Sequence, residues 1–136
     1  MKIGFSGTGR MGVAMCLHLI DNKHSLTVWN RTTRKTKPVV DAGATRVGSP
    51  AALFETNDIV INIVIDDKAA KAVYGGRDGI LSADLKGKLV VEMSTLMPDT
   101  TKALEAKVKA KGGKFLECPV GGSVAPARSG NLLGMA

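Results

Sequence analysis

The stretch that decides the fold is KIGFSGTGRMG at residues 2–12. Its first five residues form a short apolar run, which predicts a buried β-strand. Glycines stand at positions 7, 9 and 12, and apolar residues then recur at helical spacing over residues 10–22. A strand that passes through a glycine-rich turn directly into a helix is the start of a βα unit.

Each glycine of such a turn has a separate task. Gly7 permits the tight bend, Gly9 leaves room for a pyrophosphate to approach the backbone, and Gly12 lets the helix pack closely. The helix N-terminus adds unpaired N–H groups and a partial positive charge, which both attract phosphate. The motif therefore predicts a dinucleotide site, with a glycine turn that binds nothing as the alternative. The residues predicted to contact the cofactor here are Gly7, Thr8, Gly9, Arg10 and Met11.

The remaining sequence repeats the alternation of strands and helices. Nearly continuous apolar runs, typical of strands covered on both faces, predict strands at 25–30, 58–65, 88–93 and 114–118, with a weaker one at 45–47. Helical patterns lie at 32–42, 67–75 and 98–111, and the first of them is expected to start as a loose turn because it carries Pro38. Ser49 before Pro50 marks another helix start. We therefore predict one α/β domain over residues 1–136, with a doubly wound, mostly parallel Rossmann-type sheet in three αβα layers.

The charge balance bears on possible partners. The chain carries 19 Lys and Arg against 12 Asp and Glu, a formal net charge of +7. This favours an anionic partner, either nucleic acid or a phosphorylated small molecule, unless the basic residues only form a solvated surface. Aromatic residues, which stack on bases, make up only 4% of the chain. The sequence therefore predicts no nucleic-acid partner.

Membrane and secreted classes are also disfavoured. No apolar run reaches the roughly 18–20 residues that span a bilayer, so no membrane partner is predicted. The apolar stretch after Lys2 resembles a signal peptide, but the glycines of the turn and Arg10 interrupt it. Cys16 and Cys118 are too few for a disulfide framework and fit a reducing, cytoplasmic location.

The end of the second predicted strand indicates which dinucleotide binds. A site that prefers NAD usually carries Asp or Glu about 20 residues downstream of the glycines, where it accepts from the ribose 2′-OH. Here the strand ends in VWNRT at 28–32, without a carboxylate. Asn30, Arg31 and Thr32 offer donors that suit a 2′-phosphate. This predicts NADP as the cofactor; the alternative is that Arg31 and Arg34 are ordinary exposed residues at a helix start.

The next two strand ends bear on the same site, because ligands of open α/β sheets bind beyond the carboxyl ends of the strands. Val64 and Ile65 are predicted to line the adenine-side ribose, and Thr95 to lie near the nicotinamide. The hydroxyls of Ser94 and Thr95 either orient the nicotinamide carboxamide or only complete a turn.

The other reactive side chains are predicted to be structural. Asp66 and Asp67 are adjacent carboxylates that suit acid–base chemistry, but we favour capping of the following helix. His18, His24 and Cys118 lack partners in a recognisable catalytic arrangement. No spacing of Cys, His and Asp supports a metal site.

The last segment, residues 119–136, is rich in glycine and proline. Its loop Gly121-Gly122-Ser123 offers backbone N–H groups to an anion or serves as a linker. The sequence stops within an apolar run, LLGMA, which a finished domain would normally not leave at its end. We therefore expect the chain to be a fragment or a truncated product.

Together, four motifs make the chain resemble the β-hydroxyacid dehydrogenase family, which includes 3-hydroxyisobutyrate dehydrogenase and the glyoxylate/succinic semialdehyde reductases. The resemblance covers essentially the whole sequence. The motifs are GFSGTGRMG at 4–12, WNRT at 29–32, EMST at 92–95, and ECPVGGS at 117–123 with ARSGNL at 127–132. The third is similar to the fifth-strand motif whose Thr contacts the nicotinamide side of the cofactor. The last resembles the substrate loop, which implies substrate contacts by Gly121, Gly122 and Ser123.

Two departures from the family pattern are visible. The family usually has Ser-Gly-Gly after Pro-Val, so the expected substrate-binding hydroxyl is missing at Gly121. The family also tends to have Leu-Pro where this chain has Val64-Ile65, a change that van der Waals contact should tolerate.

The resemblance implies hydride transfer between NADP(H) and a small β-hydroxyacid or short semialdehyde acid. The family's catalytic lysine lies in an all-helical second domain that usually also makes the dimer contacts. No lysine of this chain matches it, so no catalytic residue is predicted here and the full-length form is expected to be a homo-oligomer. The alternatives are a domain of an imine reductase or a 6-phosphogluconate-type dehydrogenase, or a non-catalytic dinucleotide-binding module.

Overall fold

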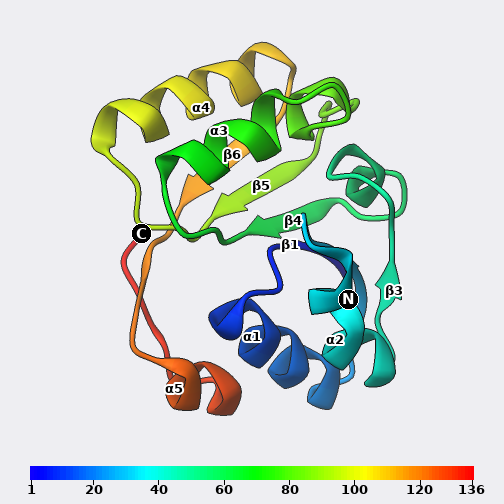
Figure 1. Cartoon of the computed structure of the whole chain (residues 1–136). Helices are drawn as coiled ribbons and strands as arrows, with labels where there is room; N and C mark the ends of the chain where they lie inside the picture. The colour runs from blue at the N-terminus through cyan, green and yellow to red at the C-terminus, as the bar shows by residue number, and fades with distance from the viewer.

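Six strands form one parallel sheet in the computed structural model, which describes all 136 residues (Figure 1). The strands are β1 (Lys2–Ser6), β2 (Ser25–Trp29), β3 (Thr45–Arg46), β4 (Ile59–Asn62), β5 (Leu89–Glu92) and β6 (Lys114–Glu117). Their order is β3-β2-β1-β4-β5-β6, and every neighbouring pair is parallel. The order reverses between β1 and β4, which confirms the predicted doubly wound topology.

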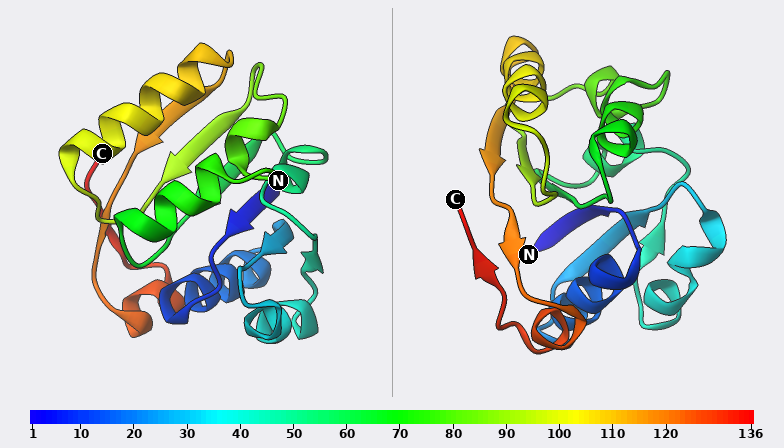
Figure 2. Two further views of the ribbon diagram at one scale, coloured as in Figure 1. Left: turned by 45° about the horizontal axis from the view of Figure 1, so that its top comes forward. Right: turned by 60° about the vertical axis from the view of Figure 1, so that its left-hand side comes forward.

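Helices cover both faces of the sheet, which confirms the three predicted layers (Figure 2). One face packs against α1 (Arg10–Asp21), α2 (Lys37–Asp41) and α5 (Val124–Ser129). The other packs against α3 (Asp67–Gly75), α4 (Pro98–Ala110) and the 3₁₀ turns η2 (Ala51–Phe54) and η3 (Ile80–Ser82). A third 3₁₀ turn, η1 (Thr33–Thr36), leads into α2.

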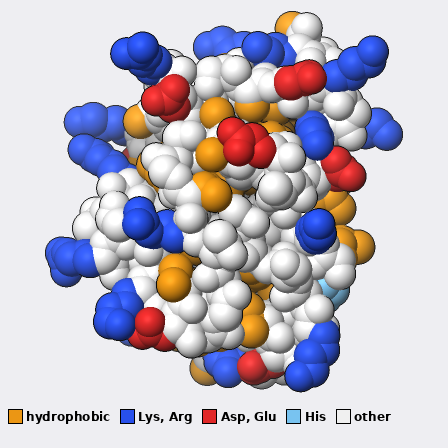
Figure 3. Space-filling view, turned by 90° about the vertical axis from the view of Figure 1, so that its right-hand side faces the viewer, with side chains coloured by type: hydrophobic (Ala, Val, Ile, Leu, Met, Phe, Trp, Pro, Cys, Tyr) orange, Lys and Arg blue, Asp and Glu red, His pale blue; other side chains and the backbone are white.

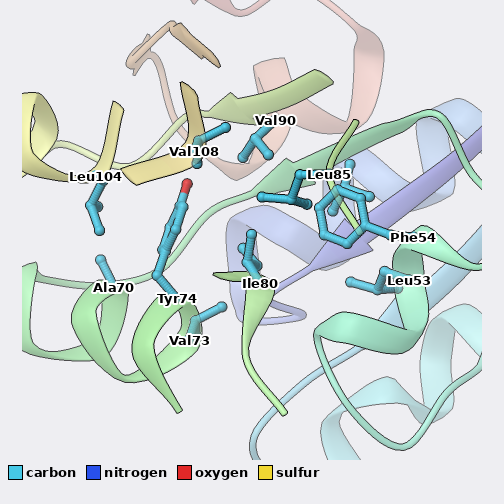
Figure 4. Packing of buried hydrophobic residues seen from close by; sticks show 11 residues of the cluster. Leu53, Phe54, Ala70, Val73, Tyr74, Ile80, Leu85, Val90, Leu104 and Val108 are labelled. Atoms are coloured by element: carbon cyan, nitrogen blue, oxygen red, sulfur yellow. The ribbon is translucent and has the colours of Figure 1, made fainter. Parts of the chain in front are cut away.

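The core is split by the sheet into two hydrophobic clusters. Neighbouring residues of one strand serve different clusters, as Val60 packs on the α3–α4 side and Ile61 on the α1 side. This explains why the strands read as continuous apolar runs rather than alternating ones. On the α3–α4 side, the ring of Tyr74 lies among Ile80, Leu104 and Val108 (Figure 4).

The helical stretch predicted over 32–42, with a loose turn at its start because it carries Pro38, forms η1 followed by the short α2, as expected. Two other predicted elements differ from the structure. The helix expected after Ser49 is only η2, although the Ser49 Oγ accepts the Ala52 N–H at 3.2 Å as a cap would. The strand expected over 58–65 ends at Asn62, so Val64 and Ile65 lie in the following loop.

Residues 119–136 fold back onto the domain, contrary to the linker alternative. β7 (Val120–Gly121) and β8 (Leu133–Gly134) pair antiparallel, and α5 lies beside α1 (Figure 1). Ala127 is buried against α1, and Arg128 pairs with Asp21 at 2.6 Å. Gly130 has φ +78, and a Cβ there would overlap the His18 ring, so α5 docks closely.

Candidate functional site

Every segment in which the sequence predicted a cofactor or substrate contact lies at one edge of the sheet, where the strands end. Ladder hydrogen bonds continue just past the strand ends: Gly7 N–H to Trp29 O at 2.9 Å, Ile63 N–H to Ser6 O at 3.0 Å and Met93 N–H to Asn62 O at 2.9 Å. Cys118 N–H extends the series to Glu92 O at 2.9 Å. We call this edge the carboxyl edge and the opposite one the amino edge.

The glycine turn between β1 and α1 is shaped by backbone contacts. Gly7 has φ +101, a conformation that side-chain-bearing residues rarely adopt, and a Cβ there would overlap the Ile63 carbonyl oxygen. A Cβ on Gly12 would overlap the Gly7 carbonyl oxygen, so α1 starts directly against the turn. These two glycines are therefore required by the fold itself.

Gly9 differs from its two neighbours because nothing in the chain crowds it. A Cβ there would meet no atom within 4 Å, and the residue has φ −69, which any amino acid adopts. The N–H groups of Gly9, Arg10 and Met11 make no hydrogen bond within the chain, and no side chain caps α1. Open space beside unpaired donors at a helix N-terminus fits a dinucleotide pyrophosphate.

Asn30 ties the end of β2 to the glycine turn. Its Oδ1 accepts the Thr8 N–H at 2.9 Å, and its Nδ2 donates to Thr32 O at 3.0 Å. One N–H of this amide is left for a ligand, so Asn30 fixes the turn as well as offering the predicted donor. Arg31 and Arg34 are exposed and take part in none of the ion pairs of the chain.

The loop after β4 carries Val64 and Ile65, which were predicted to contact the cofactor, followed by the carboxylates of Asp66 and Asp67. Val64 is partly buried and Ile65 is 90% exposed. Asp66 caps α3, since its Oδ1 accepts the Ala69 N–H at 2.8 Å, which confirms the capping interpretation. Asp67 accepts from the Met97 N–H and the Thr100 hydroxyl and so links the starts of α3 and α4. Both carboxylates are engaged in structural contacts.

A buried carboxylate lies below the ends of β4 and β5. Glu92 has no exposed surface. Its Oε2 accepts from Asn62 Nδ2 at 2.8 Å and from the Tyr74 hydroxyl at 2.7 Å, and its Oε1 accepts the Ser94 N–H at 3.0 Å. The Ser94 Oγ in turn accepts the Val64 N–H at 2.8 Å. Burial raises the pKa of Tyr74 well above its usual value, and the charge and hydrogen bond of Glu92 raise it further.

This network was missed at the sequence level. Ser94 was expected either to orient the nicotinamide or to complete a turn, and the structure uses its side chain to join two loops. Thr95 next to it is exposed at the carboxyl edge. The available signal was Glu92 itself, a charged residue within the otherwise apolar run KLVVEM at 88–93.

The three residues predicted to contact the substrate lie between the end of β7 and the start of α5. Gly121 ends β7, Gly122 has φ +124, and Ser123 is exposed before α5.

Both cysteines are free, and burial raises the pKa of the Cys16 thiol. No group of three or more His, Cys, Asp or Glu residues is arranged to hold a metal ion. None of the helices combines the length and apolarity needed to cross a membrane.

Fold and turn together define a dinucleotide-binding domain of the Rossmann type. The chain belongs to the family of the NAD-binding domain of 6-phosphogluconate dehydrogenase, whose model matches residues 2–136. This confirms the type of fold and the family relationship that the motifs indicated.

Curated relatives include an enzyme and a nuclear factor. The chain is 38% identical over 133 residues to glyoxylate/succinic semialdehyde reductase 1 of Arabidopsis thaliana, and the match covers 98% of this chain and 46% of the reductase. It is 39% identical over 132 residues to the cytokine-like nuclear factor N-PAC of Xenopus tropicalis, covering 97% of this chain and 25% of that protein. The chain thus spans between a quarter and a half of the length of these relatives.

Solved structures agree with the fold. Psf3, solved in complex with NADP+ and 2-OPP, superposes with a TM-score of 0.91 at 30% identity, covering 97% of this chain and 47% of Psf3. The 3-hydroxyisobutyrate dehydrogenase of Mycobacterium tuberculosis has a TM-score of 0.90 at 22% identity, covering 98% and 45% of the two chains. An imine reductase of Streptomyces aurantiacus has a TM-score of 0.83 at 28% identity, covering 92% and 43%.

Proposed function

We propose that the chain binds NADP(H) at the carboxyl edge as the cofactor domain of a β-hydroxyacid dehydrogenase. The observation that carries this proposal is the open space at Gly9 beside the unpaired N–H groups of Gly9, Arg10 and Met11. These groups would hold the pyrophosphate, because a helix N-terminus combines free donors with a partial positive charge. The relative solved with NADP+ at 30% identity supports the same ligand.

The other contacts follow from the order of the strands. Arg31, exposed and unpaired at the end of β2, would bind the 2′-phosphate together with Asn30 and Thr32. Val64 and Ile65, after β4, would line the adenine-side ribose. The opposite half of the dinucleotide then extends across the switch point towards β5, where Thr95 would contact it.

The nicotinamide supplies hydride transfer when it is bound, with a small β-hydroxyacid or short semialdehyde acid as the proposed substrate. Gly121, Gly122 and Ser123 would contribute backbone donors to the substrate carboxylate. The lysine expected to move the substrate proton has no counterpart in this chain, so these residues alone should bind cofactor without turnover. We further propose a cytoplasmic location and a homo-oligomeric full-length form.

A second role is favoured by one specific observation. The chain is about as similar to the nuclear factor (39% identity) as to the reductase (38% identity). A non-catalytic dinucleotide-binding module would use the same glycine turn and would differ only in lacking turnover. Imine reduction is the alternative activity, because an imine reductase shares this fold at 28% identity.

The proposal is tested by titrating the purified chain with NADPH and following the cofactor fluorescence. The Gly9→Ala variant should bind NADPH at least about tenfold more weakly, because its methyl group occupies the space needed by the pyrophosphate. Its free energy of unfolding should stay within about 0.5 kcal/mol of the wild type, since nothing crowds the new Cβ.

The matched control is Gly75→Ala at the end of α3, where a Cβ also meets nothing within 4 Å. This variant lies towards the amino edge and should bind NADPH like the wild type. Wild-type chain that does not bind millimolar NADPH, or a Gly9→Ala variant that binds unchanged, contradicts the proposal.

A further inference from the structure

The Glu92 carboxylate is fully buried and has no cationic partner. A carboxylate without exposed surface costs several kcal/mol to desolvate unless hydrogen bonds or a cation compensate it. None of the ion pairs of the chain includes Glu92, so three donors from Asn62, Tyr74 and Ser94 carry that compensation.

The donors belong to different elements. Asn62 ends β4, Tyr74 lies on α3, and Ser94 follows β5, while Glu92 is the last residue of β5. The hydrogen bonds to this one carboxylate therefore hold β4, α3 and the end of β5 at fixed distances from one another. Tyr74 reaches this position from α3 through the hydrophobic cluster (Figure 4).

The network continues into the two loops that face the proposed cofactor. The Ser94 N–H is held by Glu92 Oε1, and the Ser94 Oγ holds the Val64 N–H. Thr95 and Ile65, the next residues of the two loops, are exposed at the carboxyl edge. The position of Ser94, and with it the start of the loop that carries Thr95, is therefore tied to the buried carboxylate.

We propose that Glu92 is a positioning residue that sets the affinity for the nicotinamide half of the cofactor. It acts through the Ser94 N–H on the loop that carries Thr95, and being fully buried it touches neither cofactor nor substrate. The inference rests on the proposed function, because it assumes that the dinucleotide extends from the glycine turn towards β4 and β5.

The test compares two ligands on the Glu92→Gln variant of the full chain. Glutamine keeps the shape but places an NH₂ group against the donors that an oxygen now accepts from. The dissociation constant for NADPH should rise about tenfold, because the loop that carries Thr95 is no longer held in place and must be ordered when the cofactor binds. The dissociation constant for 2′-phospho-ADP-ribose, which lacks the nicotinamide, should change by less than about twofold.

The control Phe54→Leu disturbs the same hydrophobic cluster near the amino edge, away from the network. It should lower the midpoint of urea denaturation and leave both dissociation constants unchanged. If Glu92→Gln does not fold, Tyr74→Phe gives the same comparison, because it removes only the hydroxyl that donates to Glu92 Oε2. It should also weaken NADPH selectively.

The measurements distinguish failure of the positioning role from failure of the proposed function. Unchanged NADPH binding, or equal losses for the two ligands, overturns the positioning role while the wild type still binds both. A wild-type chain that binds neither ligand overturns the proposed function and this inference with it. A selective loss for NADPH in Glu92→Gln, absent in Phe54→Leu, supports both.

Discussion

The two edges of the sheet differ in what occupies the ends of the strands. The amino edge has a shallow cavity of about 500 Å³, formed mainly by η2, η3 and the start of β5. Its charged lining consists of Glu55, Asp78, Asp84 and Lys88, so three carboxylates face one amine. The carboxyl edge instead gathers unpaired backbone donors and the exposed Arg31.

The two edges therefore differ in how well their chemistry suits an anion, independently of the volume of the cavity. An anionic dinucleotide is disfavoured by the acidic lining at the amino edge, whereas donors and positive charge at the carboxyl edge attract it. The amino edge faces the viewer in Figure 3, where basic side chains are spread around the outline with acidic ones between them. On this face the basic side chains are thus spread out rather than gathered in one patch.

The largest effect is expected at the carboxyl edge, where Gly12 of α1 packs against the Gly7 carbonyl oxygen. Gly12→Ala places a methyl group on the Gly7 carbonyl oxygen, so α1 must move away from the turn. We expect a loss of about 3 kcal/mol in the free energy of unfolding, measured by urea denaturation, together with loss of NADPH binding. Gly75→Ala is the control for the substitution itself, and a Gly12→Ala variant as stable as this control would refute the packing argument.

The second prediction sharpens the electrostatic contrast between the edges. Arg31→Ala should raise the dissociation constant for NADPH about tenfold and leave that for NADH nearly unchanged, because only NADPH carries the 2′-phosphate. Arg77→Ala removes the same charge from an exposed site after α3 and should change neither value. Equal losses for NADPH and NADH in Arg31→Ala would show that the side chain does not read the 2′-phosphate.

The smallest effect belongs to the ion pair at the amino edge. Lys88 donates a hydrogen bond to Asp58 at 2.8 Å, and this bond and the lysine charge lower the pKa of Asp58 from 3.8. A carboxyl whose pKa is lowered on folding adds stability above its unfolded pKa, and that stability is lost as the pH falls through the folded pKa. Asp58→Asn should therefore be slightly less stable than the wild type at pH 7.

The difference between the two chains should disappear in acid, well below pH 3.8. It should be small at every pH, because solvent screens this exposed carboxylate. Thermal unfolding at several pH values measures it, and NADPH binding at neutral pH should be unaffected. A stability difference that grows towards acid pH would contradict this sign.

Much of the fold was predictable because its signals are local. The glycine spacing at 7, 9 and 12 indicated the first βα unit, and all six strands of the sheet were expected within three residues of their bounds. The errors occurred after Ser49, where the expected helix is only η2, and after Asn62, where the expected strand ends early. The segment after Pro119 was not assigned, since α5 is short and is stabilised by docking on α1.

The sequence alone determined the parallel α/β class and the glycine turn, because strand and helix periodicity and the conformational needs of glycine act between near neighbours. The tertiary structure alone decided the Glu92 network, in which Asn62 lies 30 residues and Tyr74 18 residues away, and the bond of Thr8 to Asn30 over 22 residues. No periodic pattern encodes such pairs. A buried carboxylate selects its partners only when separate elements have been brought together, since only burial makes an unmet hydrogen bond costly.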